Sequence, residues 1–424
     1  MKIVCAPQGY AFQDDGNILN VILYGNADRE TRGSAGRMIK DEINHQKLLP
    51  TAKAWDFLSI ALAVAAADRT GYRGRSPDGW TRQFDLTISV VDQTFWRTQK
   101  EVLEQALQIL STDTWKITFV VGGFQPSPPQ SPDMPSEECI ALLSGGLDSF
   151  IGNIDLAAAG KRAIAVSHTV RGDGEKQAEF ASALGGLRHL QLNHNAKMPE
   201  EETPPSQRAR SLSFLAYGVL AATTLKRYHA GESTVLYVCE NGFISINPPL
   251  TDMRLGSLST RTTHPIFLGL MQQVLDAAGL RVAIKNPYQL KTKGEMIKEC
   301  KDQGLLAAHA CKTTSCGRFG RFGYQHCGRC IPCLVRRAAF HAADFNDTTE
   351  YKFKKLGNDD KDHAAFDDVR AVAIALLTIE EEGFIRWLGP SLSTALLGDT
   401  SALEDTVHRG IGELGALLKT YGVA

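Results

Sequence analysis

The sharpest chemical signal in this 424-residue chain is the hexapeptide SGGLDS, which spans Ser144 to Ser149 and is called the glycine loop below. It follows an apolar run, and its glycines allow positive φ and close approach of the backbone. A helix start adds unpaired N–H groups, so a strand, loop and helix of this kind favour phosphate binding. The residues predicted to bind phosphate are Ser144, Gly145, Gly146, Leu147, Asp148 and Ser149. The alternative is an ordinary capped turn, since Asp and Ser cap helices in any fold.

A cysteine cluster gives the second signal. The pattern C-x10-C-x2-C-x2-C is formed by Cys316, Cys327, Cys330 and Cys333. Thiolates at these spacings are typical of a closed tetrahedral zinc site. One alternative is a catalytic role in which Cys330 and Cys333 hold a disulfide or an iron–sulfur cluster. Another is that Cys311 replaces Cys316 as a ligand.

The elements that must position the glycine loop form an alternating pattern. Short apolar strands alternate with longer helical segments after residue 138, which predicts an open, doubly wound parallel α/β sheet with helices on both faces. The expected strands are Cys139–Leu143, Ala163–His168, Arg188–Leu192, Thr234–Cys239 and Val282–Lys285, and helices are expected to begin near Asp148, Gly174, Ser206, His264 and Lys293. The glycine loop would then lie at the carboxyl end of the first strand, where nucleotide sites form.

Polar residues also follow the fourth of these strands. Glu240 and Asn241 come directly after it, and the segment from Arg261 to His264 opens a helix that can receive an anion. We therefore predict that Glu240, Asn241, Arg261 and His264 bind substrate. The alternative is a capped helix and turn in which His264 is merely satisfied.

A proline-rich segment, residues 122–138, contains five prolines and predicts an extended linker. Residues 1–121 before it are expected to form a small α+β domain, with strands at Asn17–Tyr24, Gln83–Val91 and Lys116–Val121 and helices at Ala54–Ala67 and Lys100–Leu110. Its tryptophans Trp80 and Trp96 and its basic segment Arg69 to Arg82 form either a partner surface or ordinary packing with a solvated loop.

The remaining boundaries follow from the same patterns. Residues 139–345 are expected to form the nucleotide-binding domain, and residues 346–424 a helical extension. That extension has helices at Phe366–Leu377 and Ser401–Thr420, separated by Gly and Pro breaks between Trp387 and Pro390.

Composition restricts the partners and the location. The formal charge is −1, with 46 basic and 47 acidic residues, so no global field attracts a nucleic acid. The longest apolar run, Leu58 to Ala67, is too short to span a membrane, and the first residues lack the apolar core of a signal peptide. Nine cysteines in such a chain predict reduced thiols and a cytoplasmic location.

The glycine loop resembles the PP-loop of the ATP pyrophosphatase superfamily, whose members cleave ATP between its α and β phosphates; it lacks the lysine of a Walker A loop. Together with the segment from Ser315 to Arg337 it looks like the QueC-like 7-cyano-7-deazaguanine synthases. The stretches RARSLSFLA from Arg208 and KTKGEMI from Lys291 are similar to further segments of that family. The resemblance covers residues 139 to 340 and implies a PP-loop (HUP-like) fold.

This resemblance implies a function and roles for single residues. The function is an ATP-dependent carbon–nitrogen ligase that adenylates 7-carboxy-7-deazaguanine and forms an amide or a nitrile. ATP, Mg²⁺ and Zn²⁺ are the implied cofactors. Ser144, Asp148 and Lys293 are implied as catalytic, with Asp148 holding the metal ion on the polyphosphate and Lys293 neutralising the α-phosphate or the leaving pyrophosphate. His168 is implied to contact ATP, and Arg210 to contact ATP or the substrate. The alternative for Lys293 and Arg210 is an exposed, solvated side chain.

The chain also departs from the family. Residues 240–249 (ENGFISINPP) replace the family's tyrosine-proline-aspartate-cysteine-arginine type of segment, so substrate recognition differs there. The added domain and helical extension resemble enlarged QueC-like proteins of anti-phage defence systems, the QatC group, which implies a protein partner as acceptor. Two alternatives stay open. One is a PP-loop enzyme that modifies tRNA or another nucleic acid, which a local basic run from Lys312 to Arg337 would favour. The other is a non-enzymatic nucleotide-binding scaffold.

Overall fold

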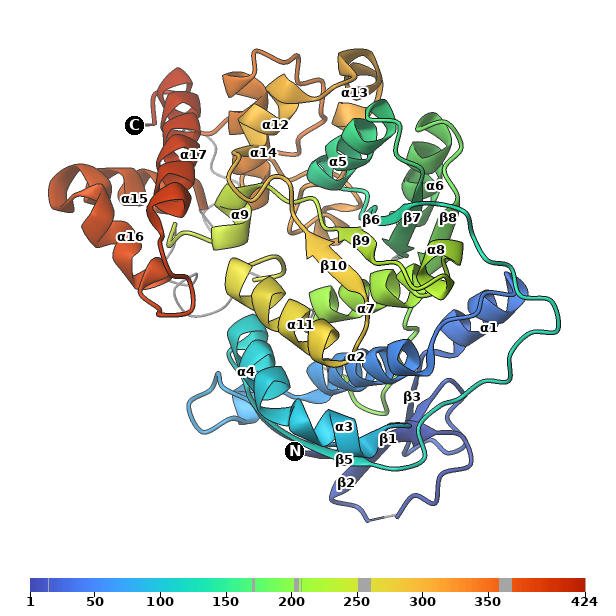
Figure 1. Cartoon of the computed structure of the whole chain (residues 1–424). Coiled ribbons are helices and arrows are strands. Elements are labelled where there is room, and N and C mark those ends of the chain that lie inside the picture. The colour runs from blue at the N-terminus through green and yellow to red at the C-terminus, as the bar shows by residue number, and fades with distance from the viewer. Residues whose placement is uncertain are drawn as a thin grey trace.

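Two parallel five-stranded sheets organise the chain, and further helices follow at the C-terminal end (Figure 1). The computed structural model describes residues 1–13, 15–169, 172–201, 206, 208–250, 261–357 and 368–423. No helix in this part of the chain combines the length and the apolar character needed to cross a bilayer.

The first sheet lies within residues 1–121, called the first α/β unit below. Its strands are β1 (Lys2–Pro7), β2 (Ile18–Leu23), β3 (Gly33–Ala35), β4 (Gln83–Ser89) and β5 (Thr114–Val120), in the order β3-β2-β1-β4-β5. Its helices are α1 (Arg37–His45), α2 (Ala52–Thr70), α3 (Gln93–Thr98) and α4 (Lys100–Ser111), with a short 3-10 turn, η1 (Arg73–Arg75).

The expected α+β character of this unit is wrong, because all four strand pairings in its sheet are parallel. The strand Lys2–Pro7 is short and was not expected, and it is the central strand that pairs with both β2 and β4. Buried and exposed residues alternate along β5, so the sheet buries one face and leaves the other polar. Such alternation is more usual in antiparallel sheets, so the sequence pattern did not indicate the parallel topology.

The second sheet carries the glycine loop. Its strands are β6 (Cys139–Leu142), β7 (Ala163–His168), β8 (His189–Leu192), β9 (Thr234–Tyr237) and β10 (Val282–Lys285). The order is β10-β9-β6-β7-β8, and every pairing is parallel. The chain leaves β6 toward β7 on one side and returns to β9 on the other, so the strand order reverses between β6 and β9. Ligands bind at such a switch point in open α/β sheets.

Helices cover both faces of the second sheet, as predicted. They are α5 (Leu147–Ala158), α6 (Gly174–Ala183), α7 (Arg210–Ala222), α8 (Lys226–His229), α9 (Gly242–Ile246), α11 (Pro265–Ala277), α12 (Lys293–Glu299), α13 (Gln303–His309) and α14 (Ile331–Ala342), with 3-10 turns η2 (Ala310–Lys312) and η3 (Gly320–Phe322). All five predicted strands are present within two residues of their expected ends. The helix expected near Ser206 begins at Arg210 instead.

The two sheets share one hydrophobic core. Helices α2 and α4 of the first α/β unit pack on α7 and α11 of the second sheet, so these helices lie between the two sheets (Figure 1). Between β5 and β6 the chain forms no helix or extended strand, and Asp133 makes a single β-bridge to Leu48. The first α/β unit is therefore packed against the helices of the second sheet over a continuous apolar contact.

The C-terminal helices are α15 (Asp368–Glu382), α16 (Phe384–Leu392) and α17 (Ser401–Thr420). The start expected at Phe366 lies outside the described residues. The break expected from Trp387 to Pro390 is wrong, because α16 includes both residues and ends two residues after the proline. Helix α17 packs against α14 and α9. The C-terminal end of the chain therefore lies beside helices of the second sheet.

Candidate active site

The glycine loop forms a closed turn between β6 and α5. Gly145 has a φ of 87°, a backbone conformation that glycine adopts without strain. The Ser144 and Ser149 hydroxyls lie 2.9 Å apart, and the Ser144 hydroxyl also accepts a hydrogen bond from the Gly146 N–H at 3.2 Å. Helix α5 has no side-chain cap at its first turn. Its N-terminal N–H groups are therefore available to an anion at the carboxyl end of β6.

Asp148 is the centre of a buried polar network at the switch point. Its carboxylate receives the Lys293 ammonium at 2.5 Å, and both side chains are less than a tenth exposed. Asn241 donates to the other carboxylate oxygen from its backbone N–H at 3.2 Å and its side-chain amide at 2.6 Å. Burial by itself raises the pKa of Asp148, but the charge of Lys293 and these hydrogen bonds outweigh burial and lower it. Asp148 is therefore a carboxylate at neutral pH.

Glu240 lies against the same carboxylate. Burial raises the pKa of Glu240 well above its ordinary value, and the neighbouring charge of Asp148 raises it further. Two adjacent acids of this kind hold one proton or one additional cation between them. Carboxylates at a phosphate site are also the protein ligands that Mg²⁺ uses, so Asp148 and Glu240 fit the predicted metal.

A capping box fixes the start of the helix that carries Lys293. The Thr292 hydroxyl accepts from the Glu295 N–H at 3.1 Å, and the Glu295 carboxylate accepts from the Thr292 N–H at 2.8 Å. Lys293 is the first residue of α12 and so has a defined direction toward Asp148. The spacing T-x-x-E is visible in the sequence, although it was not used to predict this arrangement.

Helix α17 supports the same point from the far end of the chain. Glu413 accepts a hydrogen bond from the Thr292 hydroxyl, and Arg409 donates to the Glu295 carboxylate at 2.6 Å. Burial raises the pKa of Glu413. A side chain at Gly294 would overlap the Glu413 carboxylate, with a Cβ only 2.4 Å from its oxygen. The C-terminal extension thus holds the start of α12, which nothing in the local sequence indicates.

His168 and Arg210 meet beside the glycine loop. The Arg210 Nε atom donates to His168 Nδ1 at 3.3 Å, and the Gln177 amide bridges the carbonyls of His168 and Ser144. Burial, with a smaller contribution from the charge of Arg210, lowers the pKa of His168 far below its ordinary value. His168 is therefore neutral, and it accepts the Arg210 hydrogen bond. The structure brings together these two predicted ATP contacts.

The other two predicted substrate residues lie elsewhere. The Arg261 guanidinium reaches the carbonyl of Ile109 on α4 at 3.5 Å, and His264 caps α11 by accepting from the Ile266 N–H at 3.3 Å. Burial lowers the pKa of His264 to about 4. Within the described residues neither side chain hydrogen-bonds to the glycine loop or to Asp148. Their substrate role stays a prediction.

The four predicted cysteines form one cluster. Their sulfur atoms all lie within 4.8 Å of one another, with Cys316 and Cys330 at 3.8 Å and Cys327 and Cys333 at 3.9 Å. Four thiolates about 2.3 Å from a tetrahedral zinc ion are separated by about 3.8 Å, so the cluster suits zinc. Cys311 instead contacts the backbone of 346 and 348, outside the cluster.

The cysteine cluster also braces the glycine loop. Thr314, two residues before Cys316, donates from its N–H to the Gly145 carbonyl at 2.9 Å. The neighbouring Ser315 N–H donates to His326 at 3.1 Å, and Arg336 donates to the Thr313 hydroxyl at 2.8 Å. A metal ion held by the cysteines would therefore fix the segment that contacts the loop.

Half of the basic run from Lys312 to Arg337 is internal, while Lys312 and Arg321 are exposed and Arg318 is partly exposed. Arg329, Arg336 and Arg337 are less than a tenth exposed. Their guanidinium groups donate to backbone carbonyls, including those of Lys355, Ala310 and Gly328. These three arginines stabilise the fold around the cysteine cluster and do not form an exposed basic patch.

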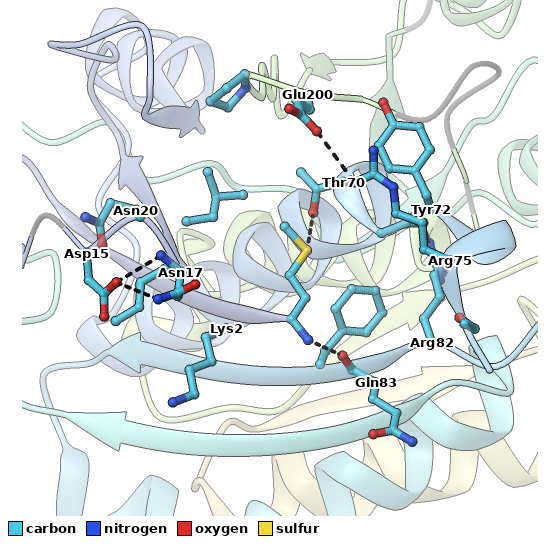
Figure 2. A pocket seen from close by; sticks show the side chains of 18 of the residues that line it. Lys2, Asp15, Asn17, Asn20, Thr70, Tyr72, Arg75, Arg82, Gln83 and Glu200 are labelled. Carbon is cyan, nitrogen blue, oxygen red and sulfur yellow. Dashed lines mark hydrogen bonds and ion pairs between the residues drawn. The ribbon is translucent and has the colours of Figure 1, made fainter.

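A pocket of about 780 Å³ lies at the amino ends of β1, β2 and β4, and no residue of the glycine loop lines it. Figure 2 shows Asp15 and Asn17 on one side of it and Arg75 facing Glu200 on the other. Ligands of open parallel sheets bind at the carboxyl ends of strands, so we base no function on this pocket.

Comparisons with known proteins agree with the predicted likeness. Residues 263–344 match the family model described as "Queuosine biosynthesis protein QueC", a region that includes α11, α12, the cysteine cluster and α14. A 7-cyano-7-deazaguanine synthase from Rhizobium leguminosarum bv. trifolii is 27% identical over 243 residues, which are 50% of this chain and 91% of that protein. One from Paracoccus denitrificans is 29% identical over 205 residues, covering 47% and 76% of the two chains.

A shorter match has a higher sequence identity. A 7-cyano-7-deazaguanine synthase from Desulfitobacterium hafniense is 34% identical over 94 residues, which are 21% of this chain and 38% of that protein. The chain is thus a distant homologue of these synthases over about half of its length. The narrower resemblance to the QatC group stays a prediction.

Proposed function

We propose that this chain is an ATP-dependent carbon–nitrogen ligase that adenylates the carboxylate of 7-carboxy-7-deazaguanine. The observation that carries the proposal is the glycine loop at the switch point of the second sheet, with the Asp148–Lys293 pair beside it. This arrangement occurs in a chain that is similar to 7-cyano-7-deazaguanine synthases. Phosphate-binding N–H groups next to a buried lysine suit a reaction in which pyrophosphate leaves.

The first step joins the substrate to AMP. A carboxylate oxygen attacks the α-phosphorus of ATP, the bond from that phosphorus to the bridging oxygen breaks, and pyrophosphate leaves with the bridging oxygen. The glycine loop binds the pyrophosphate portion, and Lys293 neutralises the charge that develops on it. Asp148 keeps Lys293 in place. Mg²⁺, held by Asp148 and Glu240, would neutralise the phosphate charge further.

The second step forms the carbon–nitrogen bond. An amine nitrogen attacks the acyl carbon, AMP leaves with one former carboxylate oxygen, and the nitrogen loses a proton to give an amide. A nitrile requires a second ATP, which adenylates the amide oxygen before AMP and the remaining protons leave. We propose two acceptors for test, ammonia and the amine of a protein partner in an anti-phage defence system. The units outside the region of similarity support the second.

The test is pyrophosphate release with ATP, Mg²⁺ and 7-carboxy-7-deazaguanine, with and without ammonia. A Ser144→Ala and Asp148→Ala double variant is the blank. We expect release that depends on the deazaguanine and is lost in the variant. Release that ignores the deazaguanine, or is absent, would remove the substrate from the proposal. ATP binding without turnover would favour a nucleotide-binding scaffold instead.

A further inference from the structure

A small pocket lies where the first α/β unit meets the carboxyl ends of β7 and β8. Its volume is about 230 Å³. Both units line it, with Asp68 and Arg69 from α2, His168 from β7, His194 after β8, and Arg210 and Ser213 from α7. Pockets that enclose a drug-sized ligand measure about 300–1,000 Å³, so this pocket suits one ring system and not a whole nucleotide.

Several polar groups of this pocket lack a protein partner. Ser213 is fully buried, and its hydroxyl makes no hydrogen bond; the Ser206 hydroxyl at the same pocket makes none either. Within the described residues Arg210 uses one of its five N–H donors, on His168, and it pairs with no carboxylate. Buried polar groups in folded proteins are nearly always satisfied by protein, water or ligand atoms, so these groups leave donors and acceptors that a polar ligand can use.

Arg69 brings a second guanidinium to the same pocket. It donates to the Glu201 carboxylate from Nε at 3.1 Å and from Nη2 at 2.5 Å. Those bonds leave three of its five donors. Burial and the charges of Arg69 and Arg210 lower the pKa of the intervening His194 to about 4, so this histidine is neutral. The Asp68 and Glu201 carboxylates balance the charges of Arg69 and Arg210, so what the pocket offers an anionic ligand is the remaining N–H donors of two guanidinium groups.

Hydrogen bonds from the first α/β unit hold the start of α7 at this pocket. Asp68 accepts from the Ala209 N–H at 3.1 Å and so caps α7, whose own residues provide no side-chain cap. The other Asp68 oxygen receives Arg82 at 2.5 Å. Arg208 donates to the Ser111 carbonyl of α4 at 3.1 Å. The start of α7, including Arg210, is therefore held by residues of the first unit.

We infer that this pocket takes the fused-ring base of a purine-type ligand, with the ligand's anionic group between Arg69 and Arg210, and that Arg69 determines specificity. The inference rests on the proposed function, which supplies two ligands of this chemistry. One is ATP, through adenine and its α-phosphate while the glycine loop binds the pyrophosphate portion, and the other is the deazaguanine acid. The first α/β unit is then part of the active site and not only a partner-binding appendage.

The test compares the wild type with Arg69→Met, which keeps the aliphatic stem and removes the charge. The control is Arg75→Met, because Arg75 pairs with Glu200 at 3.8 Å on the surface and does not line this pocket. Steady-state pyrophosphate release gives KM for ATP and for the deazaguanine acid, and calorimetry gives the affinity for each ligand alone. We expect Arg69→Met to weaken one ligand about tenfold, with kcat within about twofold, and Arg75→Met to change neither.

The outcome separates the two ligands and the two proposals. The ligand that weakens is the occupant of the pocket. The inference would be overturned if Arg69→Met left both affinities unchanged. It would also be overturned if the variant lowered the affinity for both ligands equally and lowered kcat and thermal stability as well. In either case the ligase function stands. Wild-type protein that binds neither ligand would overturn the proposed function, and the inference with it.

Discussion

Removing either partner of the Asp148–Lys293 pair should lower the free energy of unfolding by more than removing a partner of an exposed ion pair. The carboxylate and ammonium atoms lie 2.5 Å apart, and the side chains are 5% and 8% exposed, so a charge that loses this partner is largely out of water, with Glu240 still beside Lys293. Removing one partner of a buried pair costs about 3–5 kcal/mol. We expect Asp148→Asn and Lys293→Met each to lower the free energy of unfolding by about 3 kcal/mol.

A double-mutant cycle tests this reasoning. The double variant should lose less than the sum of the single variants, with a coupling energy of about 2 kcal/mol, because it leaves no unpaired charge. The measurement is the midpoint of denaturation in urea at constant m-value, for four proteins. The exposed pair Lys116–Asp85, at 3.7 Å, is the control and should couple by about 0–1 kcal/mol. Additive losses at Asp148 and Lys293 would refute the buried-pair account.

Three further outcomes follow. Glu240→Gln should be more stable than the wild type at alkaline pH. The pKa of Glu240 is raised by folding, so the stability that the protonated side chain contributes is present at low pH and is lost as pH rises through that pKa. Equal melting-temperature differences between the two proteins at every pH from 5 to 9 would contradict this. Cys330→Ser should abolish stoichiometric zinc and lower the melting temperature, whereas Cys311→Ser should retain zinc, as metal analysis of the purified variants would show. Glu413→Ala should lower kcat about tenfold with KM for ATP nearly unchanged, because it frees Thr292 at the start of the Lys293 helix; an equal change in KM would contradict a positioning role.

The parts of the site that the sequence predicted are those fixed by local chemistry. The glycine loop needs its glycines and a preceding strand, all within one short segment, and the spacing of the cysteines from Cys316 to Cys333 encodes their cluster. The second sheet was predictable because its central strands β6 and β7 are fully buried and mostly apolar, and because helical periodicity follows each of them. Local rules such as these act over a few residues.

The parts that the sequence did not predict depend on contacts between distant segments. Asn241 holds Asp148 across 93 residues of chain, and Glu413 holds Thr292 across 121. Asp68 caps α7 across 141 residues, although its position in a hydrophobic helix gave no functional signal. In the sequence, polar residues at such positions cannot be distinguished from other polar residues, because their hydrogen-bond partners become neighbours only in the tertiary fold.

The most direct measurement of the central claim follows the oxygen atoms of the substrate. The deazaguanine acid is labelled with ¹⁸O at both carboxylate oxygens, and the AMP formed by the purified protein is analysed by mass spectrometry. If the carboxylate attacks the α-phosphorus, AMP leaves carrying a carboxylate oxygen; amide formation gives one labelled AMP for each product and nitrile formation gives two. AMP that carries no label, with its new oxygen drawn from water, would contradict adenylation of the carboxylate.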